Sequence, residues 1–294
     1  MRELERDPPS DAPARPGNAT RHPSDAPARA GSATRRDKHL SIIGRGRLGY
    51  ALSAALRDAG YEVDGPLGRG ADGAGADAVL LCVPDAEIAA AADLLAPGRR
   101  VGHCSGATGL EPLAPHEAFS LHPLMTVTHG GASLLGAGAA IAGSTPEALA
   151  LAAELAAAVG MHPVQVADQD RATYHAAASI ASNFLVTLEG AAERLAARVG
   201  IERALLVPLV RASVENWAAS GARRALTGPV ARGDEATVAA QRAAIAEHDP
   251  ELLELFDVLV DATRALTSEV GLDTRAPVIE GGIAPAGLAE GQPA

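Results

Sequence analysis

The chain has 294 residues, a formal net charge of −11 at pH 7 and 47% apolar residues. The acidic balance argues against general nucleic-acid binding, which needs clustered positive charge. Two cysteines, Cys82 and Cys104, are too few for a disulfide framework or a four-cysteine zinc site. We find no apolar run long enough to cross a membrane and no apolar core of a signal peptide. We therefore expect a cytoplasmic protein with no membrane partner, no nucleic-acid partner and no metal.

Both ends of the chain are predicted to be tails. Residues 1–37 are mostly Pro, Ala, Arg, Asp and Ser, a composition that buries too little apolar surface to offset the entropy lost on ordering. The segment Pro9–Arg15 recurs as Pro23–Arg29, and this short proline-rich repeat indicates a duplicated tail, not a solenoid. Residues 276–294 are predicted to be a second loose tail.

Residues 38–168 are predicted to form an α/β domain. The segment Ala78–Val83 is apolar throughout, as in a strand that is covered on both faces. Strands alternating with helices are typical of a mainly parallel sheet. The other expected strands are 39–43, 62–67, 101–104, 119–121, 139–142 and 163–166, and the expected helices are 47–59, 85–95 and 146–159.

Residues 169–275 are predicted to form an all-α domain. They show helical periodicity and no convincing strand pattern. The expected helices are 171–199, 214–219, 235–247 and 252–269.

The strongest motif is the glycine-rich segment Gly44–Gly49, which directly follows a predicted strand and opens a predicted helix. The first glycine permits a tight turn, the second lets the backbone approach a pyrophosphate, and the third allows close packing of helix and strand. The helix N-terminus adds free N–H groups and partial positive charge. The motif predicts a Rossmann-type dinucleotide-binding domain, with cofactor-binding residues Gly44, Gly46, Arg47, Leu48 and Gly49.

The end of the second strand bears on the choice of nicotinamide cofactor. An acidic residue there would bond the ribose 2′-OH of NAD, but Asp64 falls in the middle of the strand. Arg69 lies at the strand's end, and its planar guanidinium suits a 2′-phosphate. We therefore favour NADP, with NAD as the alternative.

Further candidate residues follow the next strands. Val83 and Pro84 end a central strand, where open α/β sheets bind ligands, and we expect Asp85 to cap the following helix. Ser105 ends another strand and is expected to line the nicotinamide pocket. His122 ends a third and is expected to project toward the same crevice, where a histidine that titrates near neutral pH can act as an acid or anchor a substrate.

Three polar residues, His175, Ser179 and Asn183, have the spacing i, i+4, i+8 that places them on one face of a predicted helix. Such side chains on an alanine-rich face need polar partners, which could be each other, water or a substrate. Lys38 is the only lysine of the chain. Proton delivery near neutral pH therefore falls to His122 or His175.

Six segments of the chain together carry a resemblance to a known family: Ile42–Leu52, Leu80–Asp85, His103–Gly106, Ser120–Thr126, Tyr174–Leu188 and Leu226–Asp234. They resemble the Rossmann-like proteins that carry a C-terminal helical domain of unknown function. That family is related to ketopantoate reductase, pyrroline-5-carboxylate reductase and the deazaflavin-dependent NADP oxidoreductase.

The resemblance implies a helical domain like that of 6-phosphogluconate dehydrogenase and a homodimer formed through the helices. Ketopantoate reductases place Lys, Asn and Asn at four-residue steps on the first long helix. His175, Ser179 and Asn183 occupy similar steps here, so the lysine is absent and only the last asparagine is kept.

We expect an NADP-dependent oxidoreductase that reduces a small carbonyl or imine acid, with a 2-oxo acid such as ketopantoate as the guess that fold analogy suggests. His122 or His175 would protonate the product, and Ser105, Ser179 and Asn183 would stabilise the developing charge. Two alternatives stay open. One is a non-catalytic NAD(P)-binding sensor or scaffold, which the missing lysine favours, and the other is a deazaflavin-linked NADP reductase.

Overall fold

The computed structural model describes residues 38–128 and 133–268. The tails predicted at 1–37 and 276–294 lie outside the described residues. The chain divides into two compact units, the first ending at His175 and the second beginning at Ala176. This division falls inside helix α4 (Arg171–Ser179), later than the boundary we predicted after residue 168, because the first turn of α4 is bonded to the sheet through Arg171.

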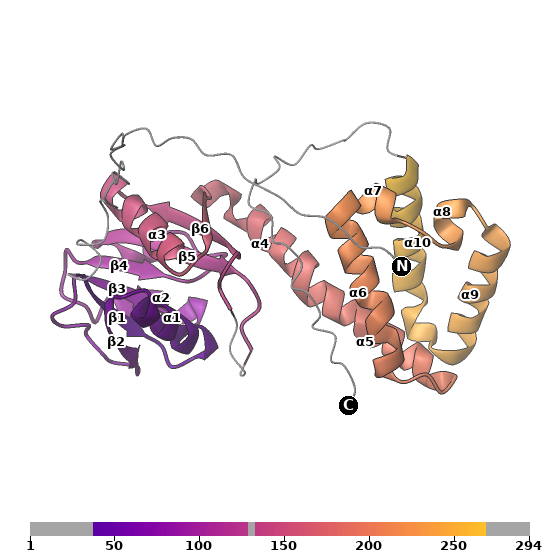
Figure 1. The fold of residues 1–294 in the computed structure, drawn as a ribbon, viewed down its shortest axis with the longest axis horizontal. Helices are drawn as coiled ribbons and strands as arrows, with labels where there is room; N and C mark the ends of the chain where they lie inside the picture. The colour runs from indigo at the N-terminus through magenta and orange to yellow at the C-terminus, as the bar shows by residue number, and fades with distance from the viewer. Residues whose placement is uncertain (1–37, 129–132, 269–294) are drawn as a thin grey trace, which may run out of the picture. The chain divides into compact units, whose positions relative to one another are not determined.

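The first unit contains a seven-stranded sheet with the order β2-β1-β3-β4-β5-β6-β7 (Figure 1). Every neighbouring pair is parallel except β5 and β6, which confirms a mainly parallel sheet. The strands are β1 (His39–Ile43), β2 (Glu62–Leu67), β3 (Ala78–Leu81), β4 (Arg100–His103), β5 (Glu117–Leu124), β6 (Gly138–Gly143) and β7 (His162–Gln165).

The strand order contains a topological switch point beside β1. The chain passes from β1 to β2 on one side and returns to β3 on the other side. The connections after β1 and β3 therefore diverge at the carboxyl edge of the sheet. Open α/β sheets bind ligands at such a point.

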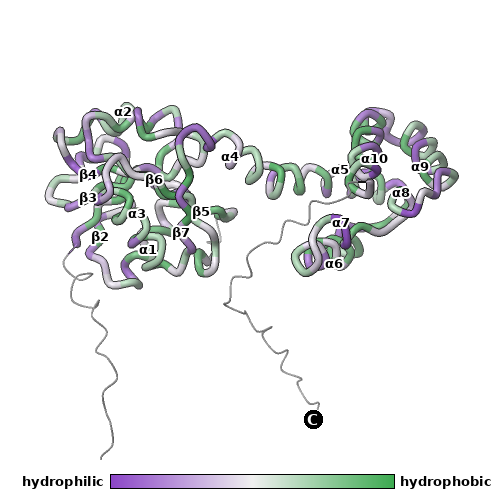
Figure 2. Tube along the Cα trace, turned by 90° about the horizontal axis from the view of Figure 1, so that it is seen from above, coloured by the Kyte–Doolittle hydropathy of each residue, from purple (hydrophilic) through white to green (hydrophobic). Residues whose placement is uncertain are grey.

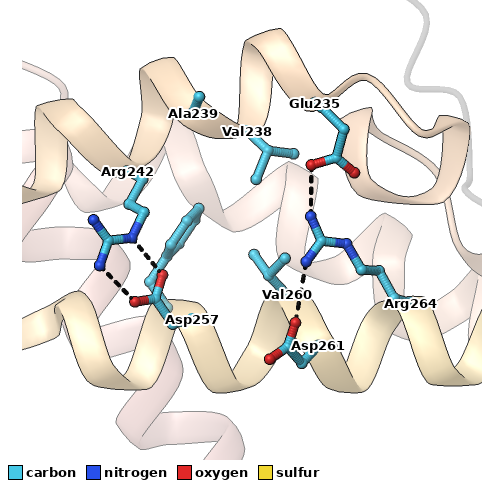
Figure 3. Close-up of a pocket in the computed structure, with 9 residues that line it drawn as sticks. Glu235, Val238, Ala239, Arg242, Asp257, Val260, Asp261 and Arg264 are labelled. Carbon is cyan, nitrogen blue, oxygen red and sulfur yellow. Dashed lines mark hydrogen bonds and ion pairs between the residues drawn. The ribbon is translucent and has the colours of Figure 1, made fainter.

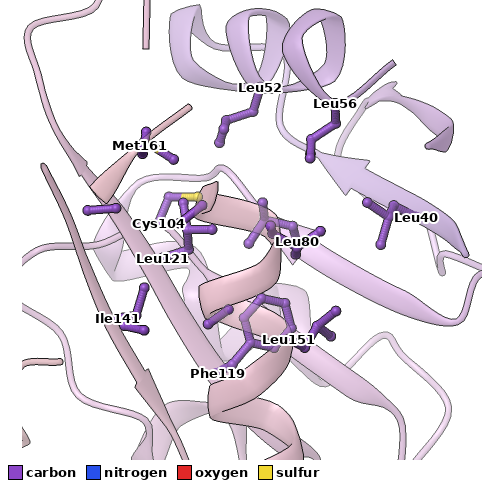
Figure 4. Packing of buried hydrophobic residues seen from close by; sticks show 14 of the residues in the cluster. Leu40, Leu52, Leu56, Leu80, Cys104, Phe119, Leu121, Ile141, Leu151 and Met161 are labelled. Carbon is purple, nitrogen blue, oxygen red and sulfur yellow. The ribbon is translucent and has the colours of Figure 1, made fainter. Parts of the chain in front are cut away.

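Helices cover both faces of this sheet. Helices α1 (Arg47–Asp58) and α3 (Pro146–Ala158) pack on one face, where Leu52, Leu56 and Leu151 join the larger hydrophobic cluster (Figure 4). The opposite face is covered by the short helix α2 (Ile88–Ala92) and by the 3₁₀ turn η2 (Glu111–Leu113). A further 3₁₀ turn, η1 (Asp85–Glu87), directly precedes α2 and has no buried residue. The first unit is thus a three-layer α/β domain.

The central strands are apolar throughout because both of their faces are buried. In β1, Ile42 belongs to one hydrophobic cluster and Ile43 to the other, and Leu80 and Leu81 divide in the same way in β3. This follows from the alternation of side chains along a strand. The hydropathy colouring in Figure 2 shows hydrophobic residues running through the strands. Strand β3 ends at Leu81, earlier than predicted.

The second unit is helical, as predicted: after β7 the described residues contain no strand. The long helix expected at 171–199 is present, but a π-helical turn, η4 (Ile180–Phe184), separates α4 from α5 (Leu185–Arg198). Helix α6 (Arg203–Ser220) is much longer than the predicted 214–219. It continues through Pro208, although proline normally ends or kinks a helix. The remaining elements are η3 (Asp168–Asp170) before α4, then α7 (Ala222–Ala225), α8 (Pro229–Arg232), α9 (Glu235–His248), η5 (Pro250–Leu252) and α10 (Leu253–Ser268).

The helical unit leaves much apolar surface uncovered. Neither α5 nor α6 has a buried residue, and large apolar side chains such as Leu205, Leu209 and Trp217 on α6 are more than half exposed. Within the described residues, no helix is both long and apolar enough to cross a membrane.

Candidate functional site

The glycine turn after β1 has the geometry that the motif predicts. The backbone N–H of Gly44 donates to the carbonyl of Leu67 at 2.9 Å, which brings the end of β2 to the turn. Gly44 has φ of +128°, and a Cβ built on it would lie 2.1 Å from the carbonyl oxygen of Cys82. A Cβ on Gly49 would lie 1.9 Å from the carbonyl oxygen of Gly44. Neither position can therefore take a side chain.

Gly46 differs, because no atom lies within 4 Å of the place its Cβ would occupy. It is the N-cap of α1, and no side chain caps the N–H groups of the first turn, which contains no acidic residue. Free N–H groups beside open space make an anion site. A hollow of about 420 Å³ lies there, lined by Gly44, Arg45, Gly46, Gly68, Arg69, Cys82, Val83, Pro84 and Glu87.

The structure thus gathers most of the predicted cofactor-binding residues around one hollow. Three of them do not line it: Arg47 is exposed at the start of α1, Leu48 packs against the hydrophobic core, and Gly49 is buried in the first turn of α1 against the carbonyl of Gly44. Arg45, which the sequence analysis did not select, does line it. Only the fold shows that its side chain lies near Gly68, whose Cβ would be 3.6 Å from the Arg45 guanidinium carbon.

The end of β2 carries positive charge. Arg69 is 80% exposed and forms an ion pair with Glu87, 2.6 Å between Nη2 and Oε1. Asp64 lies within β2, and its carboxylate is 2.9 Å from Nε2 of His39. Asp64 therefore has a partner at the opposite end of β1 from the glycine turn, and Arg45 and Arg69 are the charged side chains that share the hollow with Glu87.

A second group of side chains forms where β5 meets the start of α4. Nδ1 of His122 lies 2.7 Å from the hydroxyl of Tyr174. The rings of His122 and His175 are 6.3 Å apart between centroids, at 74° to each other. The fold therefore brings together His122 and His175, the two predicted proton donors, and adds Tyr174 in hydrogen-bond contact with His122.

The loop after β4 packs closely against His122. A Cβ on Gly106 would lie 2.9 Å from Cε1 of the His122 ring, so only glycine fits there without a shift. This contact fixes one side of the imidazole.

Ser105 is buried, and its hydroxyl is fully engaged. Its Oγ lies 2.7 Å from the carboxylate of Asp85 and accepts the backbone N–H groups of Ala107 and Thr108 at 3.2 and 2.9 Å. Our expectation that Asp85 caps a helix is wrong, since no side chain caps η1 or α2 and the carboxylate accepts from Ser105 instead. Ser105 and Asp85 close the loop after β4 onto the loop after β3.

His103, the last residue of β4, holds the same loop from within. It is fully buried; its Nδ1 accepts the N–H of Ser105 at 3.1 Å, and its Nε2 donates to the carbonyl of Gly109 at 2.9 Å. These bonds require a neutral ring protonated on Nε2. Burial lowers the pKa of His103, which agrees with that state.

Arg171 joins the start of α4 to the sheet, a role that the sequence analysis missed. Its side chain is only 2% exposed, and Nε donates to the carboxylate of Asp168 at 2.8 Å. Its Nη groups donate to the carbonyl of Ser105 and to the hydroxyl of Ser120. The pKa of Asp168 is lowered even though partial burial acts to raise it, because Arg171 and the N–H of Leu110 donate to its carboxylate.

His122 is not the near-neutral titrating group that we expected. Burial lowers its pKa to about 4, and the nearby His175 and Arg171 act in the same direction, while Asp85 partly opposes them. At neutral pH the imidazole is therefore uncharged, so it can donate and accept hydrogen bonds but cannot deliver a proton as an imidazolium. Burial raises the pKa of Tyr174, so its hydroxyl keeps its proton.

Ser179 and Asn183 belong to the second unit. Ser179 ends α4, and Asn183 is exposed in the π-helical turn. The α-helical spacing assumed for Asn183 does not hold across that turn, because a π turn takes more residues than an α turn. Their place in the site stays a prediction.

A hollow of about 430 Å³ in the helical unit has a different character. It lies between α9 and α10, and its charged side chains are paired with one another (Figure 3). Arg242 contacts Asp257 through two bonds of 2.8 Å, and Arg264 contacts Glu235 and Asp261 at 2.6 and 3.0 Å. These ion pairs tie α9 to α10, and we place the candidate site at the sheet edge instead. Among the described residues, no group of His, Cys, Asp and Glu is arranged to hold a metal ion.

The pKa of His122 gives a direct test of this geometry. Its folded-state pKa lies below the ordinary value of 6.5, so the unfolded chain takes up a proton first as the pH falls. His122 should therefore cost no stability above pH 6.5 and should lower the free energy of unfolding progressively between pH 6.5 and 4, by at most about 3 kcal/mol. NMR titration of the His122 ring should give a pKa near 4, and His122→Asn should remove this part of the pH dependence. A measured pKa of 6 or higher would contradict the buried contact with Tyr174.

The chain resembles known proteins in both sequence and structure. Residues 137–263 match the family model described as "Domain of unknown function (DUF2520)". No curated protein sequence matches the chain. A structure from Bacteroides fragilis, described as that of a candidate NADP oxidoreductase, matches with a TM-score of 0.68 and 17% identity, over 79% of this chain and 100% of that one.

Two further structures show the same fold. A protein from Thermotoga maritima matches with a TM-score of 0.64 and 23% identity, over 78% of this chain and 98% of its own. The 1-pyrroline-5-carboxylate reductase of Streptococcus pyogenes matches with a TM-score of 0.53 and 15% identity, over 78% of this chain and 98% of its own. The resemblance seen in the sequence is thereby confirmed for the fold: the chain has a Rossmann-like domain followed by a helical domain, and its residues 137–263 match the model of the family of unknown function DUF2520.

Proposed function

We propose that the chain is an NADP-dependent oxidoreductase that reduces a small carbonyl or imine compound. The observation that carries this proposal is the shared position of two groups of residues. The open glycine turn and the His122–Tyr174 contact both lie at the carboxyl ends of parallel strands, β1 for the turn and β5 for the histidine. Dinucleotide-dependent enzymes of this architecture bind their cofactor along that edge.

The residues present fit NADP. Gly46 leaves space at the uncapped N-terminus of α1, where a pyrophosphate would accept backbone N–H groups. Arg45 and Arg69 border the same hollow, and their guanidinium groups match a 2′-phosphate. Glu87 already pairs with Arg69, so the hollow holds no carboxylate that is free to select NAD. The bound cofactor would supply a hydride.

The chain must supply the proton that completes a reduction. His122 is neutral at pH 7, so it cannot act as an imidazolium donor there. His175 is exposed and lies beside it, and we propose that His175 delivers the proton. The Tyr174 hydroxyl holds the His122 ring, and that pair would position the reacting heteroatom through hydrogen bonds. Ser179 and Asn183 are proposed to stabilise the charge that develops on it.

For the substrate we propose a small 2-oxo acid, such as ketopantoate, or the corresponding imine. This choice is supported by the fold and by the positions of His175 and Ser179, four residues apart on α4. Binding of NADPH without turnover of any oxo acid or imine would favour the sensor alternative.

We also propose a homodimer formed through the helical unit. Leu205, Leu209 and Trp217 are spaced by four and eight residues on α6, so they share one broad face, and their exposures are 69%, 66% and 57%. An uncovered apolar face of this kind is rare on a monomeric protein and typical of an interface.

The choice of cofactor is tested by Arg69→Ala. Loss of a charge-assisted bond to a phosphate should weaken NADPH binding by about ten- to a hundredfold, the equivalent of roughly 1.5–3 kcal/mol, and leave NADH binding nearly intact. Calorimetric titration with both cofactors measures this. Asp64→Asn is the matched control and should change neither affinity. Equal weakening of both cofactors by Arg69→Ala would mean that Arg69 has only a structural role, and an NADH preference lost in Asp64→Asn would identify Asp64 as the selector.

Proton delivery is tested by His175→Ala. It should lower turnover by about 10²- to 10⁴-fold, the usual contribution of a general acid, and leave NADPH affinity and melting temperature unchanged. The assay follows NADPH oxidation with a panel of 2-oxo acids and cyclic imines. Tyr174→Phe keeps the ring, removes only the hydroxyl that holds His122, and should have the smaller effect on turnover. A His175→Ala protein that is stable and fully active would place the acid elsewhere.

The dimer is tested by Leu209→Asp, which puts a charge on the apolar face of α6. Analytical ultracentrifugation should show a dimer for the unmodified chain and a monomer for this variant. Val164→Asp, at an exposed site on β7 in the first unit, is the control and should stay dimeric. A monomer in the unmodified chain would refute the proposal.

A further inference from the structure

The two cysteines of the chain lie side by side at the edge of the sheet. Cys82 and Cys104 directly follow β3 and β4, and the residues before them, Leu81 and His103, are paired in register. The two sulfur atoms are 3.6 Å apart. Both side chains face the same hydrophobic cluster, so they point to the same side of the sheet.

Cys82 is also part of the candidate cofactor hollow. It lines the hollow together with Gly44 and Gly46, and it is partly accessible. Its carbonyl oxygen is the atom that excludes a side chain from Gly44, and its Cβ would lie 3.5 Å from a Cβ on Gly49. Cys82 therefore packs against both of the closed glycines of the turn.

We propose that Cys82 and Cys104 form a reversible disulfide when the protein meets a peroxide, and that this bond weakens binding at the glycine turn. The first half concerns the thiols alone, and the second half rests on the proposed function. A disulfide has an S–S length of about 2.05 Å, so the two sulfurs must approach by about 1.5 Å. Adjacent strand ends that already hold the sulfurs in contact permit this with a small shift of the backbone.

The positions of the two thiols assign their roles. Cys82 is reached from the hollow, so its thiolate attacks the peroxide; an S–O bond forms, the O–O bond breaks, and the leaving hydroxide takes a proton to become water. Cys104 is buried, and its hydrogen bond with Cys82 and its burial both raise its pKa, so it stays protonated as a thiol during the first step. It then attacks the Cys82 sulfur; the S–S bond forms, the S–O bond breaks, and the departing hydroxide takes the Cys104 proton. The two thiols lose two electrons in total, and the peroxide is reduced to two waters.

Closing this bond would move the backbone that supports the turn. Cys82 donates its N–H to the carbonyl of Ile43 at 2.7 Å and contacts Gly44 through its own carbonyl. A displacement of Cys82 toward Cys104 therefore shifts the backbone at Ile43 and Gly44, which supports the proposed pyrophosphate site. Linkage requires the reverse effect as well, so a bound cofactor should oppose formation of the disulfide.

The thiol half is tested on the full chain with hydrogen peroxide, followed by thiol titration and mass measurement under denaturing, non-reducing conditions. The free thiols should fall from two to none in a single chain whose mass drops by about 2 Da, and dithiothreitol should reverse the change. In Cys104→Ser, the same treatment should leave a sulfenic acid on Cys82 that dimedone traps. Disulfides between chains, or two separately oxidised thiols in the unmodified protein, would overturn the proposal.

The binding half is tested by NADPH titration of the reduced and oxidised protein. Oxidation should weaken NADPH binding at least tenfold, dithiothreitol should restore it, and saturating NADPH should slow disulfide formation. Cys104→Ser keeps Cys82 in the hollow but cannot close the bond, so peroxide should change its affinity by less than tenfold. An equal loss in Cys104→Ser, or no loss in the oxidised unmodified protein, would overturn the coupling. If the reduced protein binds no NADPH although the disulfide forms, the proposed function fails and the thiol half stands.

Discussion

A buried guanidinium holds the candidate site together. Arg171 is almost inaccessible to water, and a charge in such a place must be paired and hydrogen-bonded, since leaving it unpaired costs several kcal/mol. Its partners are Asp168 just before α4, the carbonyl of Ser105 after β4 and the hydroxyl of Ser120 in β5. These bonds fix the first turn of α4 against the ends of two strands. The contact between Tyr174 and His122, which are far apart in the sequence, depends on that attachment.

Much of the fold follows from local sequence patterns. The glycine motif, the uniformly apolar strand at Ala78 and the proline that starts α3 each have one strong structural explanation, and the sheet and its first helices formed where they indicate. The elements that differ from the sequence-based prediction depend on tertiary contacts or on backbone energetics, which no short sequence pattern reveals. Pro208 lies inside α6, and because proline disfavours a helix interior, the sequence does not predict the first half of this helix. Nothing in the sequence of Ile180–Phe184 distinguishes a π turn from an α turn. Such turns recur at functional sites, and this one carries Asn183.

The cofactor side of the candidate site was more predictable than the side that holds the histidines. Steric rules set the glycine turn, because the open position at Gly46 and the closed positions at Gly44 and Gly49 follow from how a strand, a turn and a helix meet. By contrast, the state of His122 depends on its burial and on neighbours from other segments, so its pKa could not be read from its place in the sequence. The same holds for Ser105 and Asp85, whose side chains bond each other across two loops. Arg171 and His103 were missed because only their tertiary partners reveal their roles.

Hydrogen exchange of the full chain with and without NADPH tests the central claim most directly, because it locates the bound cofactor without assuming a substrate. If the dinucleotide lies along the carboxyl edge of the sheet, NADPH should slow exchange in the peptides that contain Gly44–Gly49, Cys82–Asp85 and Ser105–Gly109. Peptides from β7, at the far edge of the sheet, should not change. Binding of NADPH with no protection in these three loops, or with protection confined to the helical unit, would contradict the account.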